Sequence, residues 1–399
     1  MKHRIVVLGA GYAGAYVAGN LARRLSPADV EITVVNAEPD FVQRQRLNQL
    51  AAGREIKAPK LGEVFAGTGI RLRVARVTAV DPERGIVAVA DSNGGGEVGY
   101  DTLVYALGSH VADQHVPGVA VHAFDVASRP AALRLRERLD RLENRGEGGS
   151  VVLVGDGLTG IETATEIAES RPRLSVTLVA RGELGARLSA GARSHLRRAC
   201  DRFGITVLEH TSVDAVEAAR VVCADASVLA SDATVWTAGF AVSPIAAAGG
   251  LDVTDNGQIV VDRTMRSISH PNVYAVGDSV YTLGDNGRQL PMNCGSAGFT
   301  GRQAINAIVG RLTGRKIASI KLVYQYNAIS LGQRDGILQL IDGAAQTRPK
   351  FLGGRKAVRV KGAIQNGALW GTSHPTFSLP KRRHRLAAPS ERSAEKTAG

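Results

Sequence analysis

The sequence is poor in cysteine and has no long uninterrupted apolar run. Its 3 cysteines, among 399 residues, are scattered at Cys200, Cys223 and Cys294. They are too few for a disulfide framework or a four-thiolate metal site, so no metal is predicted and a reducing, cytoplasmic compartment is expected. Glycines break the apolar run near the N-terminus, unlike a secretory signal, and no stretch reaches the ~18 apolar residues of a membrane span.

The first 310 residues lack an excess of either charge. They hold 32 basic and 33 acidic residues, whereas residues 311–399 hold 17 basic and 4 acidic ones, which accounts for the net charge of +12. A basic face of this kind attracts anionic lipid headgroups, phosphorylated ligands or an acidic protein partner. A solvated face with a frayed basic tail accounts for the same charge equally well. Nucleic acid is not expected as a partner.

Length and composition indicate a globular protein of several domains. At ~150 residues per domain, a chain of 399 residues forms two to three domains. Its 44% hydrophobic and 22% charged residues are ordinary values, which excludes a disordered or fibrous chain.

Glycine motifs of the form G-x-G-x-x-G occur three times, and two of them stand between a strand-like and a helix-like segment. Residues 4–8 precede the first and 12–25 follow it, while 151–154 precede the second and 158–169 follow it. In such a unit the first glycine permits a tight turn, the second lets the backbone approach a pyrophosphate, and the third lets helix pack on strand. Two dinucleotide sites are therefore predicted, at Gly9, Gly11, Gly14 and at Gly155, Gly157, Gly160.

The remaining match, formed by Gly94, Gly96 and Gly99, has a different context. It lies between two strand-like stretches, residues 86–90 and 102–106, and no helical pattern follows it. We interpret it as a hairpin loop.

The strand after each predicted helix ends where the adenosine ribose of a dinucleotide would lie. In the first unit this residue is Asn36, whose amide oxygen can still accept hydrogen bonds from the ribose, with Glu38 as a fallback. In the second unit the strand ends at Ala180, and Arg181 follows it. A guanidinium in this place favours NADPH over NADH, whereas Gly160 argues the other way because alanine commonly accompanies a 2′-phosphate.

Several ordered segments resemble the two-dinucleotide flavoprotein reductases, which form the FAD- and NAD(P)-dependent pyridine nucleotide-disulfide oxidoreductase superfamily. The similarity covers the two crossover segments of that family, its NAD(P) helix and its late FAD segment, matched here by residues 100–109, 231–239, 160–164 and 270–278. Within the superfamily, residues 41–47 and 331–336 look most like the type II NADH dehydrogenase branch.

The resemblance implies an α/β fold with two Rossmann-like domains, the NAD(P) domain being inserted in the FAD domain, and a small β-rich C-terminal cap. The expected order is the first FAD half (1–115), the NAD(P) domain (116–240), the second FAD half (241–310), the cap (311–380) and a basic, disordered tail (381–399).

The resemblance also implies which residues bind the cofactors FAD and NAD(P)H. Asp278 is expected to hydrogen-bond the ribitol or pyrophosphate of FAD. A helix that starts near residues 294–296 is expected to direct its N-terminus at the flavin and to stabilise negative charge there. No catalytic acid or base is identified. The expected cofactor-binding residues are Gly9, Gly11, Gly14, Asn36, Arg44, Gly108, Gly155, Gly157, Gly160, Glu162, Arg181, Gly239, Gly277, Asp278 and Gly295.

Two departures from the family pattern concern the electron acceptor. Residues 41–53 lack the C-x4-C pair of disulfide-reducing members, and disulfide exchange needs such a pair, so disulfide reduction is excluded. Quinone-reducing members carry two glutamines in an A-Q-x-A-x-Q pattern, whereas Gly295 and Phe299 stand in those places here. Cys294 is interpreted as a small buried packing residue. Other candidate polar groups are His110, His115, Gln333 and Arg334.

The C-terminal part shows alternating apolar residues at 337–341 and 357–360, which suggests β structure. No amphipathic helix with a wide apolar face is evident, and the basic cluster at 381–385 lacks hydrophobic anchors. Only weak, salt-sensitive membrane adhesion is therefore expected. The residues after Leu386 are small and polar, and disorder is expected there.

Together these features predict an FAD-dependent oxidoreductase that passes hydride from NAD(P)H to FAD and electrons to a small-molecule acceptor, quinone-like or other. Two alternatives stay open. One is a biosynthetic flavin oxidase or dehydrogenase whose electron acceptor is O₂ or NAD(P)⁺. The other is a non-catalytic flavoprotein with a basic partner-binding region, against which the second glycine motif and Glu162 argue. The sequence also leaves a homodimer open.

Overall fold

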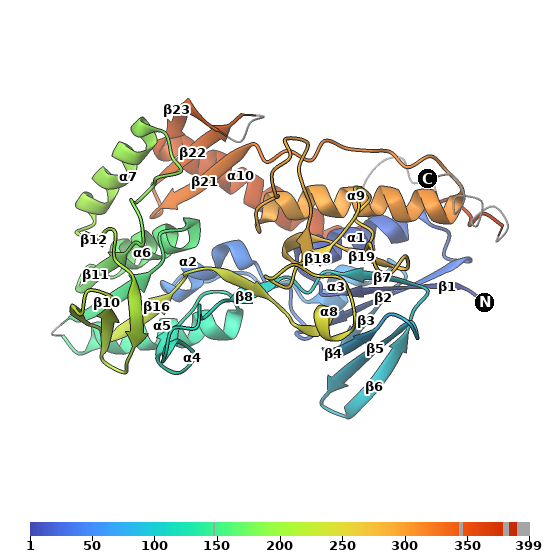
Figure 1. Cartoon of the computed structure of the whole chain (residues 1–399), viewed down its shortest axis with the longest axis horizontal. Coiled ribbons are helices and arrows are strands. Elements are labelled where there is room, and N and C mark those ends of the chain that lie inside the picture. Colours follow the sequence, from blue (N-terminus) through green and yellow to red (C-terminus); the bar gives the residue numbers. More distant parts are fainter. Residues whose placement is uncertain (147, 343–345, 378–382, 389–399) are drawn as a thin grey trace.

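The structure, a computed structural model, describes residues 1–146, 148–342, 346–377 and 383–388. Two sheets of parallel strands lie side by side along the long axis, and the C-terminal cap lies above the second sheet in Figure 1. None of the helices in these ranges combines the length and the hydropathy needed to cross a lipid bilayer.

The first sheet has five parallel strands in the order β19-β7-β1-β2-β3. Their bounds are β1 (His3–Leu8), β2 (Val30–Asn36), β3 (Ile70–Val74), β7 (Thr102–Tyr105) and β19 (Val273–Ala275). Helices α1 (Tyr12–Arg24) and α9 (Cys294–Thr313) pack together above this sheet in Figure 1. Below it lies an antiparallel sheet of β4 (Arg76–Asp81), β5 (Ile86–Asp91) and β6 (Gly94–Gly99). Segments from both halves of the chain thus build one domain.

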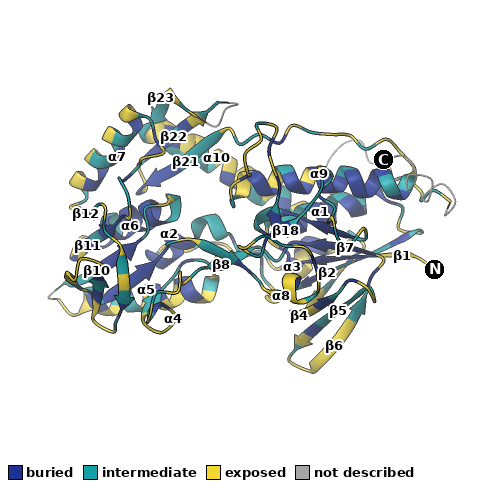
Figure 2. Ribbon diagram, in the orientation of Figure 1, coloured by how far each residue is buried: buried dark blue, intermediate teal, exposed yellow. Residues whose placement is uncertain are grey.

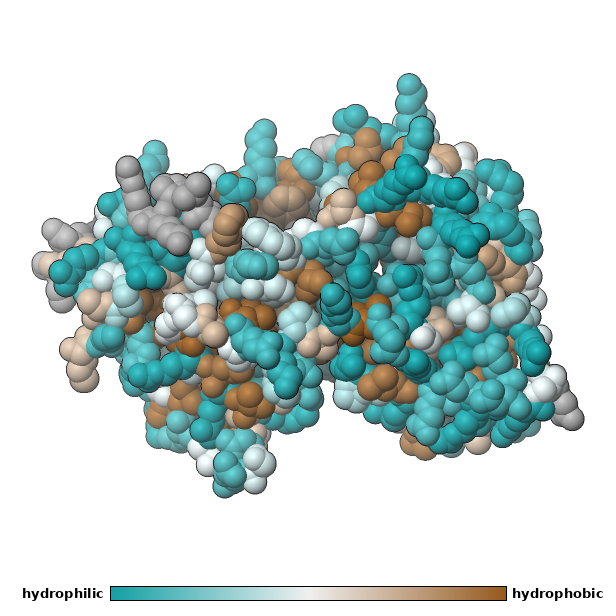
Figure 3. Space-filling view, turned by 180° about the vertical axis from the view of Figure 1, so that it is seen from behind, coloured by the Kyte–Doolittle hydropathy of each residue, from teal (hydrophilic) through white to brown (hydrophobic). Residues whose placement is uncertain are grey.

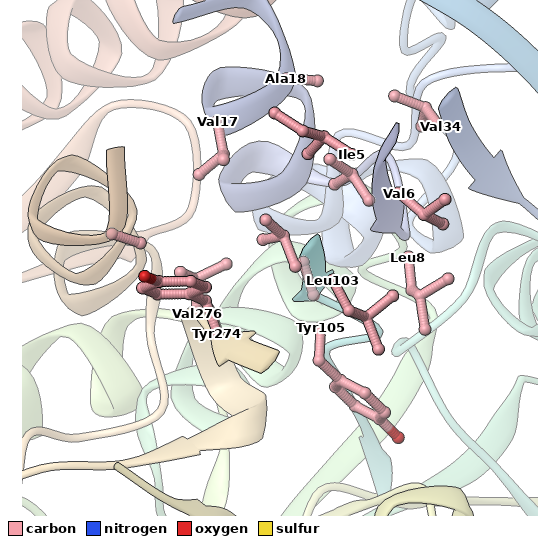
Figure 4. Packing of buried hydrophobic residues seen from close by; sticks show 14 of the residues in the cluster. Ile5, Val6, Leu8, Val17, Ala18, Val34, Leu103, Tyr105, Tyr274 and Val276 are labelled. Atoms are coloured by element: carbon pink, nitrogen blue, oxygen red, sulfur yellow. The ribbon is translucent and has the colours of Figure 1, made fainter. Parts of the chain in front are cut away.

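The core of this first domain forms around the central strand β1. Its residues Ile5 to Leu8 are all apolar and at most 1% exposed. Val17 of α1 and Val276 after β19 belong to the same cluster (Figure 4). Continuous apolar strands are typical of parallel sheets that are covered on both faces. Figure 2 shows the result, with α1 and α9 largely buried and β6 largely exposed.

The second sheet is also parallel, in the order β12-β11-β10-β16-β9. Its strands are β9 (Ala123–Phe124), β10 (Gly149–Val154), β11 (Leu174–Val179), β12 (Thr206–Leu208) and β16 (Ala233–Trp236). It carries α5 (Arg129–Asn144), α6 (Leu158–Ser170), α7 (Ala190–Arg202) and a small antiparallel sheet of β13 (Val213–Val216), β14 (Arg220–Cys223) and β15 (Val228–Ala230). Strands β8 (Ser109–Val111) and β17 (Phe240–Val242) pair antiparallel where the chain enters and leaves this domain. The expected α/β fold with two Rossmann-like domains is confirmed.

Short elements complete the two domains. They are α2 (Leu47–Ala51), α3 (Leu61–Phe65), α4 (Val119–His122), α8 (Ile245–Ala248), β18 (Ile259–Val260), β20 (Val280–Tyr281) and the 3₁₀ turns η1 (Arg44–Arg46) and η2 (Gly277–Ser279).

The cap consists of the antiparallel strands β21 (Tyr326–Leu331), β22 (Asp335–Ile341) and β23 (Thr347–Gly353), followed by the long helix α10 (Gly354–Ser373). The strand expected at residues 357–360 is therefore wrong, because these residues lie in α10. Two apolar residues two positions apart fit either period, and a four-residue window cannot distinguish them. Helix α10 buries Ala357 and Gln365, while Val360, Ile364 and Trp370 are exposed.

The glycine motif at Gly94, Gly96 and Gly99 is not a loop but strand β6, which pairs with β5. The hairpin itself was predicted correctly, and its turn precedes Gly94. Glycines can occupy an edge strand, although their lack of side chains weakens it.

Residues 383–388 lie against the first domain. His384 forms a β-bridge with Leu25, and the Ala387 N–H donates to the Leu312 carbonyl oxygen at 3.0 Å. Leu386 packs on the core of that domain. The disorder expected from residue 381 onward thus differs from the structure at residues 383–388. Lys381, Arg382 and residues 389–399 lie outside the described residues.

Candidate functional site

The first glycine motif forms a tight turn between β1 and α1. Gly9 has φ +91°, and a Cβ on it would lie 2.4 Å from the carbonyl oxygen of Ala106. A Cβ on Gly14 would lie 1.9 Å from the carbonyl oxygen of Gly9. Around the Cβ position of Gly11, in contrast, no atom lies within 4 Å. The outer two glycines thus pack against the protein backbone, and the middle glycine leaves free space. A phosphate-binding turn requires this arrangement.

The second motif repeats this geometry between β10 and α6. Gly155 has φ +118°, and a Cβ on Gly160 would lie 1.9 Å from the Gly155 carbonyl oxygen. The Cβ position of Gly157 is open to 4 Å. Gly11 and Gly157 are the N-caps of α1 and α6, and no side chain caps the first turn of either helix. The N–H groups and the positive ends of both helix dipoles are therefore free to bind phosphate.

Asn36 at the end of β2 supports the first glycine turn. Its Oδ1 accepts a hydrogen bond from the Ala10 N–H at 2.8 Å, and its Nδ2 donates to the Glu38 carbonyl oxygen at 2.7 Å. The side chain of Glu38 is exposed beside it. Because an amide oxygen has a second lone pair, Asn36 can hold the turn and still accept a hydrogen bond from a ribose.

Arg44, Ser109 and Asp278 meet beside the N-terminus of α1. The Ser109 hydroxyl donates to Asp278 Oδ2 at 2.7 Å, and Arg44 Nη1 donates to the Ser109 carbonyl oxygen at 2.6 Å. Arg44 Nη1 also lies 3.8 Å from Asp278 Oδ2. A Cβ on Gly277, in η2, would lie 3.3 Å from the Cβ of Ala13 in α1. Three segments far apart in the sequence thus bring a guanidinium, a hydroxyl and a carboxylate to the first glycine turn.

Gly108 and Gly239 stand at the two crossovers between the domains. Both have positive φ, +71° and +107°. Ser279 Oγ donates to the Gly108 carbonyl oxygen at 3.2 Å, and the Ala112 N–H donates to the Gly239 carbonyl oxygen at 3.2 Å. These left-handed conformations favour glycine and allow the chain to turn sharply between the two domains.

Arg44 of the polar cluster and Ser296 at the start of α9 each have a buried polar atom without a hydrogen-bond partner among the described residues. These atoms are Arg44 Nη2 and Ser296 Oγ. Buried polar groups in folded proteins are nearly always paired, and a polar ligand bound at the first glycine turn would supply a partner for these two atoms. Together with the open Cβ position of Gly11, they fit FAD, which presents phosphates, hydroxyls and a polar ring edge.

Helix α9 begins at Cys294, as expected, and Asn293 Oδ1 caps it by accepting from the Ser296 N–H at 2.9 Å. Cys294 is exposed to solvent, so its interpretation as a buried packing residue is wrong. Desolvation and then the charge of Asp278 raise the pKa of the thiol to about 11. Such a thiol is protonated at neutral pH and is a poor nucleophile.

The cap holds Glu162, a contact that sequence reasoning missed. Lys361 of α10 forms an ion pair with Glu162, and the Ser330 N–H donates to Glu162 Oε1 at 3.0 Å. Both charged side chains are only 12% exposed. The charge of Glu162 also contributes, after desolvation and Asp278, to the raised pKa of the Cys294 thiol. A carboxylate on a buried helix face needs a cation, but nothing in the sequence distinguishes Lys361 from the other basic residues.

Tyrosines at the start of the cap close the side of Gly295. A Cβ on Gly295 would lie 3.6 Å from Tyr324 Cε2. The Tyr324 hydroxyl donates to Asn327 Oδ1 at 2.7 Å, and burial raises the pKa of Tyr324 to about 12. Burial and the nearby Cys294 thiol also raise the pKa of Tyr326. Phe299 packs on the core of the first domain. The ring of Tyr324 thus lies beside Gly295, one of the two positions where quinone-reducing members of the family carry a glutamine.

The other predicted polar residues do not join this site. His110 and His115 are exposed, and neither imidazole forms a hydrogen bond within the described ranges. Gln333 and Arg334 form the turn between β21 and β22. There the Gln333 N–H donates to Glu169, which lies ~17 Å along α6 from its glycine end.

Arg181 lies two residues after the end of β11, behind Ala180, and is exposed. It forms no ion pair with any residue whose placement is described.

Two parallel sheets, each opening onto a glycine turn with a free helix N-terminus, define a two-dinucleotide oxidoreductase. The model of the pyridine nucleotide-disulphide oxidoreductase family matches residues 3–301. The chain belongs to this family and is an oxidoreductase.

Comparisons with individual proteins agree with this assignment. An NADH dehydrogenase-like protein of Mycobacterium tuberculosis is 30% identical over 356 residues, which cover 84% of this chain and 87% of the relative. Demethylphylloquinone reductase of Synechocystis is 27% identical, over 84% of this chain and 86% of its own. The structure of NDH2 from Plasmodium falciparum in complex with NADH superimposes with a TM-score of 0.80, at 16% identity, over 94% of this chain and 97% of that one.

Proposed function

We propose that the protein binds FAD in its first domain, takes hydride from NAD(P)H bound in its second domain, and passes the electrons to a quinone-like acceptor. The observation that carries the proposal is the repeated glycine turn, with the same open middle position in two adjacent domains. One turn suits a resident flavin dinucleotide and the other an exchanging nicotinamide dinucleotide.

The polar cluster beside α1 supports FAD at the first turn. Gly11 offers room for the phosphates, Arg44 and Asp278 offer a charged donor and a charged acceptor, and Ser296 offers an unpaired hydroxyl at the start of α9. FAD, when bound, accepts hydride from the nicotinamide and delivers electrons onward. The chain supplies orientation, exclusion of water and the positive end of the α9 dipole.

At the second turn, Gly157 offers the corresponding room for NAD(P)H, and Arg181 stands exposed after the adenosine strand. A guanidinium pairs well with a 2′-phosphate, which favours NADPH. NADH is the alternative, since the Mycobacterium tuberculosis relative is NADH dehydrogenase-like and the Plasmodium falciparum structure is a complex with NADH.

The acceptor is not a disulfide. Cys200 and Cys223 are buried in the second domain, and Cys294 is a free, protonated thiol. Beside Gly295 lies instead the ring of Tyr324, which can stack on a planar acceptor. A relative that is a demethylphylloquinone reductase supports a quinone-like ring.

Peripheral membrane contact through α10 is part of this proposal. Val360, Ile364 and Trp370 are exposed along the helix, and Trp370 packs edge-on against the exposed Phe377, with ring centroids 4.8 Å apart. Exposed apolar residues beside basic ones on one helix suit a lipid interface, where a membrane quinone would be met.

The test is anaerobic stopped-flow mixing of the purified protein with NADH or NADPH, followed by oxidation with quinones, O₂ or ferricyanide. We expect rapid bleaching of the flavin and fastest reoxidation by a quinone. Flavin that neither nucleotide reduces would contradict the proposal and favour a substrate-oxidising flavoenzyme. Reduced flavin that quinones leave unoxidised would overturn the acceptor assignment alone.

A further inference from the structure

A shallow groove on the cap is lined mainly by arginines. It has a volume of about 210 Å³ and is formed by Gln333, Arg334, Arg355, Val358 and Arg359. Arg334 comes from the turn between β21 and β22, while Arg355 and Arg359 stand four residues apart on α10. Residues with this spacing share one face of a helix, so Arg355 and Arg359 line the groove from the same side of α10.

None of the three guanidiniums forms an ion pair or a hydrogen bond with the residues that the structure describes. Carboxylates do lie close by, but other groups engage them. Asp335 receives hydrogen bonds from His195 and Arg202, at 2.7 and 2.8 Å. Glu169 accepts from the Gln333 N–H at 2.5 Å. A backbone N–H is uncharged, so Glu169 keeps its negative charge and offsets one of the three guanidiniums, whereas Asp335 is already paired with Arg202. The groove therefore keeps a net positive charge.

This arrangement opposes the stability of α10. Arg355, Lys356 and Arg359 occupy the first two turns of the helix, whose first turn holds no acidic residue and whose N-cap, Gly353, provides no side-chain cap. Cations at the positive end of a helix dipole repel it and one another, and acidic residues are the stabilising choice there. The long helices α5, α7 and α9 instead have capping side chains, from Ser128, Ser189 and Asn293. A bound anion resolves this conflict.

We propose that Arg334, Arg355 and Arg359 form a binding site for a phosphate group. A guanidinium can donate two parallel hydrogen bonds to the oxygens of a phosphate group. Three guanidiniums around one groove could therefore surround a single phosphate group. Figure 3 shows long hydrophilic side chains projecting from the corner of the molecule that holds the cap. The phosphate belongs either to a soluble phosphorylated compound or to a lipid headgroup. The lipid case rests on the membrane contact proposed above for α10, whereas binding of a soluble phosphate does not depend on the proposed function.

The experiment compares two double variants of the flavin-loaded protein that lose the same charge. The groove variant is Arg355→Gln with Arg359→Gln. The control is Arg348→Gln with Lys350→Gln, which changes two exposed cations on β23 outside the groove. Calorimetry with inorganic phosphate and with pyrophosphate, at constant ionic strength, measures binding. Co-sedimentation with vesicles of phosphatidylglycerol or of phosphatidylcholine tests the lipid source. Both variants keep the dinucleotide sites, so their difference isolates the groove.

We expect the groove variant to bind phosphate or phosphatidylglycerol at least about tenfold more weakly, and the control to match the wild type within twofold. Saturable binding of free phosphate identifies a soluble ligand, and a groove-dependent effect on vesicles alone identifies a headgroup. The groove variant should also raise the thermal midpoint without phosphate and lose its response to phosphate. Equal losses in both variants, or no saturable binding of any probe, would overturn the site. Flavin reduction by NAD(P)H should be unchanged in both variants.

Discussion

The two glycine turns have nearly the same backbone but different surroundings. At both, the third glycine lies so close to the first that a Cβ would come within 1.9 Å of its carbonyl oxygen, and the middle glycine is open. The first turn is enclosed by a polar cluster that includes Arg44 and Asp278 and by the start of α9. The second has the exposed Arg181 at its adenosine side and the cap contact through Glu162.

The difference suggests how one motif serves two kinds of binding. A cofactor at the first turn would be held by segments from three parts of the chain, and its release would leave Arg44 Nη2 and Ser296 Oγ buried without partners. A cofactor at the second turn would meet fewer such groups and could exchange. The motif determines that a dinucleotide binds, whereas the surrounding segments determine how long it stays.

The sharpest way to break this comparison is to fill the open position of each turn. Gly11 and Gly157 have φ −69°, which any residue adopts, so valine at either position should leave the fold intact. We expect Gly11→Val to purify without flavin. Gly157→Val should keep its flavin and be reduced by NAD(P)H about 100-fold more slowly. Absorbance spectra and stopped-flow rates measure both effects, and circular dichroism checks the fold. Exchanged phenotypes would mean that the cofactors are assigned to the wrong turns.

Among the contacts around the second glycine turn, the ion pair between Lys361 of the cap and Glu162 should contribute most to the free energy of unfolding. Lys361→Met would leave the Glu162 carboxylate buried without its cation, at a cost of about 3–5 kcal/mol. Adding Glu162→Gln to this variant removes the unpaired charge and should restore most of the loss. Urea unfolding measures the free energies. Similar stability of the single and the double variant would show that the pair is not buried in solution.

A second carboxylate on α6 makes the second unit sensitive to pH. Glu166 is 1% exposed, and desolvation is the main cause that raises its pKa from 4.5 to about 7. The folded state binds this proton more tightly than the unfolded state, so stability falls as pH rises from 4.5 to 7 and stays lower above.

Replacing Glu166 by glutamine should therefore increase the unfolding free energy at pH 8, by on the order of 1–3 kcal/mol, with a much smaller gain near pH 4.5. Denaturant unfolding at both pH values tests this. A gain of the same size at both would exclude desolvation of the carboxylate as its cause.

The smallest expected effect concerns nucleotide choice at the second turn. Arg181→Ala removes the cation beside the adenosine strand, which should raise KM for NADPH about tenfold and leave KM for NADH within about twofold. Steady-state assays with both nucleotides measure this. Equal changes for both would show that Arg181 does not contact the 2′-phosphate.

The sequence was most informative where function depends on local backbone geometry. Glycines at this fixed spacing between a strand and a helix specify a tight turn, so both turns and the start of α9 were predicted correctly. Residues that depend on packing between domains were missed. Lys361 looks like any other basic residue until α10 carries it onto Glu162, and the exposure of Cys294 depends on how distant segments pack around the start of α9. Helix α10 was missed because Val358 and Val360 fit a strand equally well over so short a window.

Resident flavin at the first turn is the central claim, and the cofactor content of the purified protein tests it most directly. We expect a yellow protein that releases FAD on denaturation, close to one equivalent per chain. Colourless protein that takes up no FAD after incubation with it would contradict the account.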